Sequence, residues 1–290
     1  MFLEIKDLTC FYMGGGPFEV KALDRINLKV NKGEFLGLIG RTGSGKTTLV
    51  QHFNGLIKPS QGTVIFQGKD LYGQERVDWR EIRQKIGLVF QHPEDQLFGE
   101  TVYEDVAFGP RKLGIDDNFT NQRVKEALRL VNLNFDEIKE RSPFSLSRGE
   151  MRRVAIAGVL SMEPELLVMD EPTAGLDPRG RQELLEQVRY LHQEKGLTII
   201  FVSHNMGEIA RLAHRLVVME EGKIVLEGTP GKIFKEGERL LSLGLELPQI
   251  TLLMLTLKRQ GRDVKTDIFT VEKAREEIMK MMKGKWGEPC

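Results

Sequence analysis

The sequence predicts an α/β fold in which a parallel sheet is joined by an antiparallel β subdomain, a helical insert and a small C-terminal helical appendage. Two observations predict it. Short apolar runs that look like strands alternate with amphipathic helical patterns, which is the order of elements in α/β domains. Most of these runs are apolar throughout, as expected for parallel strands that are buried on both faces.

The composition is that of a globular protein without an electrostatic bias. The chain has 290 residues, 40% of them hydrophobic, which suits one large domain or two. Lysine and arginine together number 42, as do aspartate and glutamate, so the formal net charge is zero. Because domains that coat nucleic acid are usually strongly basic, we expect no nucleic-acid partner. The two cysteines, Cys10 and Cys290, lie too far apart to indicate a disulfide framework or a zinc site.

The first thirty residues differ from the rest of the chain. Residues 3–12 (LEIKDLTCFY) and 22–30 (ALDRINLKV) alternate apolar and polar side chains, which is typical of an antiparallel edge sheet. GGGP at 14–17 is the expected turn between them. The strands predicted for the parallel sheet are EFLGLIG (34–40), KIGLVF (85–90), ELLVMD (165–170), LTIIFVS (197–203) and RLVVME (215–220), with a helix over 180–196.

Two further regions are predicted to be helical. Residues from about 92 to 160 interrupt the rhythm of strands and form the insert, within a main domain over 1–231. Residues 232–290 form the appendage, in which Pro248 is expected to be the first residue of one helix and Thr270 to begin another. No segment approaches the roughly 18 apolar residues that a membrane helix needs. If the protein acts at a membrane, we therefore expect it to associate with the membrane surface and not to span the bilayer.

The stretch GRTGSGKT (40–47) lies between a predicted strand and a predicted helix, which is the context of a phosphate-binding loop. Glycines let the backbone curl so that several N–H groups face one anion, and the helix N-terminus adds a favourable dipole. Lys46 is expected to reach the terminal phosphates, and the Thr47 hydroxyl to hold Mg²⁺. The alternative is an ordinary glycine-rich turn. The residues expected to bind nucleotide here are Gly40, Arg41, Thr42, Gly43, Ser44, Gly45, Lys46, Thr47 and Thr48.

Polar side chains follow three of the predicted strands. The run LLVMDEP ends in Asp170, a candidate Mg²⁺ ligand, and Glu171, a candidate general base that activates water for attack on the γ-phosphate. His204 follows another strand, at the edge where α/β sheets bind ligands, and is a candidate contact of the γ-phosphate. Gln91 follows a third strand and is a candidate Mg²⁺ ligand with a catalytic role. The alternatives are a solvated loop for the acids and a surface or core position for the histidine.

Five features occur in one order: GRTGSGKT, Gln91, SLSRGE (145–150), LLVMDEP with AGLD (174–177), and His204. This order resembles the nucleotide-binding subunit of an ABC transporter over about residues 2–230. The resemblance implies a P-loop NTPase core of ABC type that binds ATP and Mg²⁺ and hydrolyses ATP. It also implies that two subunits sandwich two nucleotides, with Ser147 and Gly149 of the signature loop and Asp177 meeting the nucleotide. Tyr12 matches the aromatic that stacks on adenine, with Phe11 as second candidate and packing on the edge sheet as the alternative.

Three longer stretches, 91–110, 151–181 and 247–261, resemble the ATPases of energy-coupling factor importers, which take up vitamins and transition metals. The resemblance implies a second ATPase subunit, with a non-identical homologue favoured over an identical copy. It also implies a transmembrane coupling protein, a separate substrate-binding membrane protein and a peripheral location on the cytoplasmic face of the cell membrane. The appendage is expected to help hold the ATPase pair together.

The stretch SLSRGE departs from the LSGGQ signature of that family. Ser147 and Glu150 have the S-x-x-E spacing of a capping box, which by itself accounts for an ordinary helix start. Arg148 stands where the family has glycine, so it adds bulk and charge and loses any freedom to adopt a positive φ. It either weakens the signature or strengthens a phosphate contact. Both alternatives stay open from the sequence.

Two other functions fit parts of the pattern. A soluble ABC-type ATPase that acts on nucleic acid or ribosomes is disfavoured by the neutral charge, the short distance between the phosphate loop and the signature, and the single cassette. A phosphotransferase built on the same loop leaves SLSRGE and His204 without a role.

Overall fold

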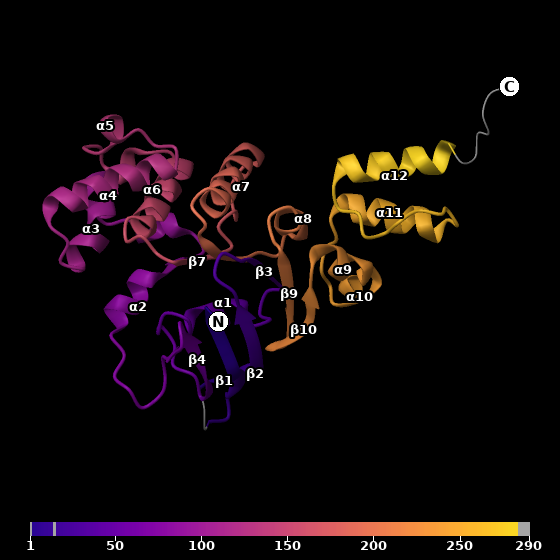
Figure 1. The fold of residues 1–290 in the computed structure, drawn as a ribbon, viewed down its shortest axis with the longest axis horizontal. Helices are drawn as coiled ribbons and strands as arrows, with labels where there is room; N and C mark the ends of the chain where they lie inside the picture. The colour runs from indigo at the N-terminus through magenta and orange to yellow at the C-terminus, as the bar shows by residue number, and fades with distance from the viewer. Residues whose placement is uncertain (1, 14–15, 284–290) are drawn as a thin grey trace.

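The computed structural model describes residues 2–13 and 16–283. The predicted GGGP turn falls partly, and Cys290 and the end of the predicted appendage fall entirely, outside the described residues. The described chain forms two sheets with helices around them, as Figure 1 shows.

A six-stranded sheet lies at the centre of the fold, in the order β10-β9-β3-β8-β7-β6. All neighbouring pairs are parallel except β10 with β9. Every residue of β3, β6, β7 and β8 is buried, which confirms the interpretation of the continuous apolar runs. The strands are β3 (Phe35–Ile39), β6 (Ile86–Val89), β7 (Leu166–Asp170), β8 (Thr198–Val202), β9 (Arg215–Glu220) and β10 (Lys223–Gly228).

A four-stranded antiparallel sheet, in the order β2-β1-β4-β5, forms the predicted β subdomain. Its strands β1 and β2 match the two alternating runs, whereas β4 and β5 were not predicted. The two sheets share one apolar core with α1, to which Ile5, Leu28, Leu38, Leu49 and Val168 contribute. The elements are β1 (Leu3–Tyr12), β2 (Val20–Val30), β4 (Gln61–Phe66), β5 (Lys69–Asp70) and α1 (Lys46–Gln51).

Short helices form the insert between β6 and β7. They pack together at one end of the molecule in Figure 1, with α7 beside them. The insert contains η1 (Pro93–Gln96), α3 (Val102–Lys112), α4 (Asp117–Leu130), α5 (Phe135–Ile138), η2 (Pro143–Ser145) and α6 (Arg148–Leu160). The other helices of the main body are α2 (Trp79–Lys85), α7 (Pro178–Gln193) and α8 (Met206–Ile209).

The appendage lies at the opposite end of the molecule from α3–α6 (Figure 1) and is helical, as expected. It has a small core of its own, in which Met254, Val264, Ile268 and Ala274 are buried. Pro248 has extended backbone angles and precedes its helix rather than opening it, so the helix begins one residue later than predicted. Its helices are α9 (Pro230–Lys235), α10 (Gly237–Ser242), α11 (Gln249–Arg259) and α12 (Val271–Lys283). No helix in the described part of the chain is long and apolar enough to cross a bilayer.

A buried ion pair joins the start of the helical insert to α6, and its arginine also contacts the loop that follows β7. Arg152 of α6 donates from Nε to Glu94 Oε2 at 2.9 Å and from Nη2 to Oε1 at 2.8 Å. Its Nη1 donates to the carbonyl oxygens of Pro172 and Ala174, in the loop that follows β7. The two paired side chains are only 2% and 3% exposed. Burial would raise the pKa of Glu94, but the hydrogen bonds from Arg152 and Arg148 lower it to about 2.

Replacing Glu94 by glutamine is expected to destabilise the fold strongly. The change removes the charge that compensates the buried guanidinium of Arg152, and breaking a buried pair in this way costs about 3–5 kcal/mol. The free energy of unfolding from urea titration measures the loss. The control is Glu126→Gln, which breaks an exposed pair with Arg129 and is expected to cost less than about 1 kcal/mol. Equal losses in the two variants would contradict this role of the buried pair.

Candidate active site

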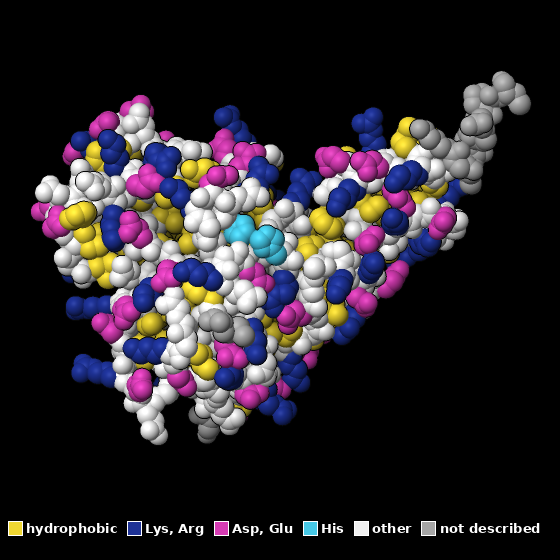
Figure 2. Space-filling view, viewed as in Figure 1, with side chains coloured by type: hydrophobic (Ala, Val, Ile, Leu, Met, Phe, Trp, Pro, Cys, Tyr) yellow, Lys and Arg dark blue, Asp and Glu magenta, His cyan; other side chains and the backbone are white. Residues whose placement is uncertain are grey.

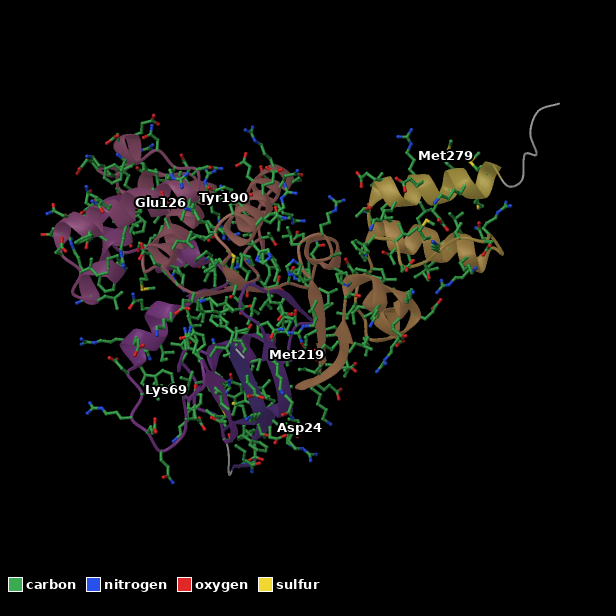
Figure 3. All side chains as sticks on the ribbon, viewed as in Figure 1. Asp24, Lys69, Glu126, Tyr190, Met219 and Met279 are labelled. Carbon is green, nitrogen blue, oxygen red and sulfur yellow. The ribbon has the colours of Figure 1, made fainter. Side chains whose placement is uncertain are left out.

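The loop between β3 and α1 has the shape of a phosphate cradle. Gly40 lies so close to its surroundings that a Cβ there would meet the backbone oxygen of Met219 at 2.4 Å and Ser44 Oγ at 2.5 Å. Met219 is labelled at the middle of the molecule in Figure 3. Gly43 and Gly45 have φ angles of 83° and 99°, which favour glycine. Steric constraints therefore explain why glycine stands at positions 40, 43 and 45. The curled backbone of this loop leads directly into the N-terminus of α1.

The ammonium of Lys46 is buried at this loop without a carboxylate in hydrogen-bond contact. Its Nζ donates to the carbonyl oxygens of Gly40 at 2.7 Å and Arg41 at 2.9 Å. Burial lowers the pKa of Lys46, and the carboxylates of Glu171 and Asp170 partly offset this. The nearby Ser44 Oγ is buried and has no hydrogen-bond partner among the described residues. A positive charge and a spare hydroxyl in one cradle fit the binding of an anion.

Asp170 and Thr47 meet across the sheet edge. The Thr47 hydroxyl donates to Asp170 Oδ2 at 2.6 Å, whereas Asp170 Oδ1 is buried with no hydrogen-bond partner among the described residues. Burial raises the pKa of Asp170, and the hydrogen bond from Thr47 and the charge of Lys46 counter this. A free carboxylate oxygen beside a hydroxyl, with a phosphate cradle next to it, fits a magnesium ion that is shared with the phosphates of a nucleotide.

Glu171 and His204 are in contact. His204 Nδ1 lies 2.8 Å from Glu171 Oε2. Glu171 adopts φ 49°, a strained conformation for a non-glycine residue, and its N–H is held by the carbonyl of Val202 at 3.0 Å. The His204 side chain is exposed, and Figure 2 shows histidine side chains at the surface near the middle of the molecule. Glu171 follows β7 and His204 follows β8, so this contact lies at the edge of the sheet where Asp170 also lies.

The other predicted residues on this side lie around the same edge with fewer contacts. Gln91 follows β6, is exposed and makes no side-chain hydrogen bond within the described residues. Tyr12, at the end of β1, exposes 41% of its surface, and its hydroxyl lies 3.1 Å from Thr48 Oγ1. The exposed ring is accessible for stacking on a planar ligand. The contact of its hydroxyl with Thr48 connects Tyr12 to α1, which follows the phosphate loop. Arg41, Thr42 and Gly43 are exposed, as residues that meet a ligand in an open loop would be.

The signature stretch begins α6 with the predicted capping box. Ser147 Oγ accepts a hydrogen bond from the Glu150 backbone N–H, and Glu150 Oε2 accepts from the Ser147 N–H at 2.9 Å. A Cβ built on Gly149 would meet nothing within 4 Å, so the first turn of α6 is open to a ligand. Asp177 caps α7, accepting from the Gly180 N–H at 2.8 Å. Ser147, Gly149 and Asp177 line one hollow of about 430 Å³.

The structure therefore separates the predicted residues into two groups. Lys46, Thr47, Asp170, Glu171 and His204 meet at one edge of the sheet, whereas the signature residues and Asp177 line their own hollow. The first group surrounds the phosphate cradle, and the second group lines a separate hollow at the surface.

Sequence reasoning missed residues that hold these loops in place. The first example is the buried pair of Glu94 and Arg152, which Arg148 also contacts through Glu94. Thr173 and Glu208 are another, since the Thr173 hydroxyl donates to Glu208 Oε2 at 2.8 Å and thereby ties the loop after Glu171 to α8. Burial raises the pKa of Glu208, and the hydrogen bond from Thr173 counters this. The sequence carries no clear signal for this contact, because Thr173 and Glu208 lie 35 positions apart.

Comparisons with known proteins agree with this geometry. The model of the ABC transporter family matches residues 23–174. The energy-coupling factor transporter ATP-binding protein EcfA2 of Clostridium tetani is 50% identical over 285 residues, covering 98% of this chain and 99% of that protein. The protein of the same name from Clostridium perfringens is 47% identical over 283 residues, with the same coverage.

Solved structures show the same fold. The structure of cbiO1 from Clostridium perfringens, part of the ABC transporter complex cbiONQ, is 37% identical with a TM-score of 0.73 and covers 87% of this chain and 98% of that one. The ATP-binding cassette MJ0796, a dimer in a post-hydrolysis state with ADP and Pi, is 28% identical with a TM-score of 0.70, covering 79% and 98%. The predicted P-loop fold of ABC type is confirmed. The chain belongs to the ABC transporter family, as an ATP-binding and ATP-hydrolysing subunit of an energy-coupling factor transporter.

Proposed function

We propose that this subunit hydrolyses ATP to power the uptake of a vitamin or a transition-metal ion through a membrane coupling protein. The observation that carries the proposal is the meeting of a phosphate cradle, a free carboxylate oxygen and the Glu171–His204 pair at one edge of the sheet. Similarity to energy-coupling factor ATPases over nearly the whole chain supports the class of transporter.

Magnesium is the second component of the proposed substrate complex. Thr47 and Asp170 would hold the ion with their hydroxyl and carboxylate oxygens, and Gln91 would add an amide oxygen from the neighbouring strand end. The buried, unpartnered Asp170 Oδ1 supports this assignment. When bound, the ion would neutralise charge on the phosphates, as it does in P-loop enzymes generally. Lys46 would exchange its two backbone carbonyls for the terminal phosphates.

Glu171 would orient and deprotonate the attacking water. Its contact with His204 Nδ1 supports a division of roles, because it leaves the Nε2 edge of the His204 ring free to face the γ-phosphate. The Glu171 backbone is fixed by β8, so the carboxylate is held in place before ATP arrives.

The second group of predicted residues would act on the nucleotide of a second ATPase subunit. Ser147 and Gly149 are open at the N-terminus of α6, and Asp177 lies across the hollow from them. We infer that two subunits pair around two ATP molecules, with a non-identical homologue as the favoured partner and an identical copy as the alternative. The appendage over 232–290 would help hold the pair together.

A groove between α2, α3 and α6 is our candidate docking surface for the transmembrane coupling protein. It has a volume of about 490 Å³, with an apolar floor and a rim that includes Arg80, Arg83 and Lys112. Phe98 and Phe108 lie at this groove, 62% and 44% exposed, in edge-to-face contact at 4.9 Å. Because the groove begins a few residues after Gln91, an amphipathic helix seated in it would move with the nucleotide site. The subunit would then lie peripherally on the cytoplasmic face of the membrane, beside the substrate-binding membrane protein.

Changing Glu171 to glutamine is expected to reduce steady-state ATP hydrolysis about 100-fold or more, because a general base contributes about 10²–10⁴-fold. Binding of Mg·ATP is expected to persist. Mixed with its second ATPase subunit, the variant is expected to accumulate in a closed pair, which light scattering detects as the summed mass of the two subunits; alone, it doubles in mass only where two identical copies pair. The matched control is Glu165→Gln at the opposite end of β7, which is expected to turn over normally. Full turnover in Glu171→Gln would refute the assignment of the base.

Changing Phe98 to alanine is expected to weaken docking to the membrane partner. The variant subunit, co-expressed with the membrane proteins of its transporter, would be recovered with them in detergent at a fraction of the wild-type yield, because the exposed ring is an anchor of the groove. Its affinity for Mg·ATP as an isolated subunit would be unchanged. Phe119, equally exposed at 61% on α4, provides the control Phe119→Ala. Equal recovery of both variants would rule out this groove.

A further inference from the structure

A second arginine contacts the buried carboxylate of Glu94. Arg148, the first residue of α6, donates from Nε to Glu94 Oε1 at 2.9 Å. Arg152 already contacts both oxygens of that carboxylate. Arg148 is therefore not needed to neutralise Glu94, and the contact requires another explanation.

The two arginines differ in their surroundings. The Arg152 side chain is 2% exposed and also donates to two backbone carbonyls of the neighbouring loop. The Arg148 side chain is 57% exposed, and its Nη1 and Nη2 make no hydrogen bond within the described residues. Without Arg148, both oxygens of the buried Glu94 carboxylate would still accept hydrogen bonds from Arg152, so no buried charge would lose its partner. Arg152 thus serves the fold, whereas loss of Arg148 is expected to leave stability nearly unchanged.

The contact joins two segments that face different nucleotides. Glu94 lies three residues after Gln91, and the intervening turn is short, with the Asp95 N–H held by the His92 carbonyl at 3.1 Å. Arg148 directly follows Ser147 at the start of the signature turn. A displacement of Gln91 therefore carries Glu94 with it, and the charged hydrogen bond to Arg148 transmits that displacement to Ser147 and Gly149.

We propose that Arg148 is a positioning residue that makes the first turn of α6 follow the Gln91 segment through Glu94. The inference rests on the proposed function, in which Gln91 meets the nucleotide of this subunit and the signature turn meets that of the second subunit. The occupancy of one nucleotide site then sets the orientation of residues that complete the other. In this proposal Arg148 acts through the Glu94 carboxylate, whereas direct contact of its Nη1 and Nη2 with phosphate is the alternative that the experiment separates.

Three variants test the proposal. Arg148→Met keeps the length of the side chain but removes the donor, and Arg148→Lys keeps the charge and one donor. The control Arg129→Met removes an arginine of equal side-chain exposure, 57%, which pairs with Glu126 on α4. Hydrogen exchange of the backbone amides of residues 148–152 is measured with and without Mg·ATP, at a protein concentration where light scattering shows single subunits.

We expect Mg·ATP to slow exchange at residues 148–152 in the wild type, in Arg148→Lys and in Arg129→Met, and to have no such effect in Arg148→Met. In steady-state hydrolysis, Arg148→Met is expected to raise KM for ATP about 5–10-fold, at the lower end of typical couplings between sites. Its kcat should stay within about 2-fold, since a positioning role changes the cost of closure and not the chemical step.

Equal protection of these amides in wild type and Arg148→Met would overturn the inference, whatever the rate of hydrolysis. A fall in kcat with unchanged KM would also overturn it and would indicate direct contact of Arg148 with the reacting phosphate. If single subunits show the difference in protection but the assembled pair of ATPase subunits does not hydrolyse ATP, the proposed function is contradicted instead.

Discussion

The arrangement of the site depends on the parallel pairing of three buried strands. In this sheet β3 pairs with β8 and β8 with β7, with Leu38 opposite Val202 and Asp170 also opposite Val202. Because parallel strands end at the same edge, the residues that follow each strand are brought together there. The cradle before Lys46, the acids after β7 and His204 after β8 meet for this reason. Their contacts, from Thr47 to Asp170 and from His204 to Glu171, are consequences of the register.

The carboxylate of Glu94 is a second constraint. It connects the start of the insert, just after β6, with α6 through Arg148 and Arg152. Arg152 attaches α6 to the loop between β7 and α7, and Arg148 attaches the signature turn to Glu94 at the start of the insert. In the proposed pairing, a chain built in this way would contribute to two nucleotide sites: one at its own sheet edge, and one on the face that presents Ser147, Gly149 and Asp177. Movement at one site would then reach the other through ion pairs instead of being lost in flexible loops.

Much of this could be predicted from the sequence, because the decisive signals are local. Continuous apolar runs predicted the buried strands, the glycines predicted the cradle, and the S-x-x-E spacing predicted the cap of α6. The partnership of Glu94 with Arg152 could not be predicted, since the residues are separated by 58 positions and no local pattern marks a buried pair. For the same reason Arg148 was expected either to weaken the signature or to contact phosphate, and its contact with Glu94 was not foreseen. The short strands β4 and β5 carry too few residues for a clear pattern. The start of α11 was predicted one residue too early, because the ring of Pro248 suits both the first turn of a helix and the residue before it.

The free oxygen of Asp170 is proposed to bind a magnesium ion together with the phosphates of ATP, and the rest of the proposed site depends on it. Calorimetric titration of ATP with and without Mg²⁺, into wild-type protein and Asp170→Asn, tests it directly. Magnesium is expected to tighten ATP binding to the wild type at least tenfold, about 1.4 kcal/mol, and to have almost no effect on the variant, which should still bind metal-free ATP through the cradle. An equal effect of magnesium on both proteins would contradict the account, because the ion would then be held without Asp170.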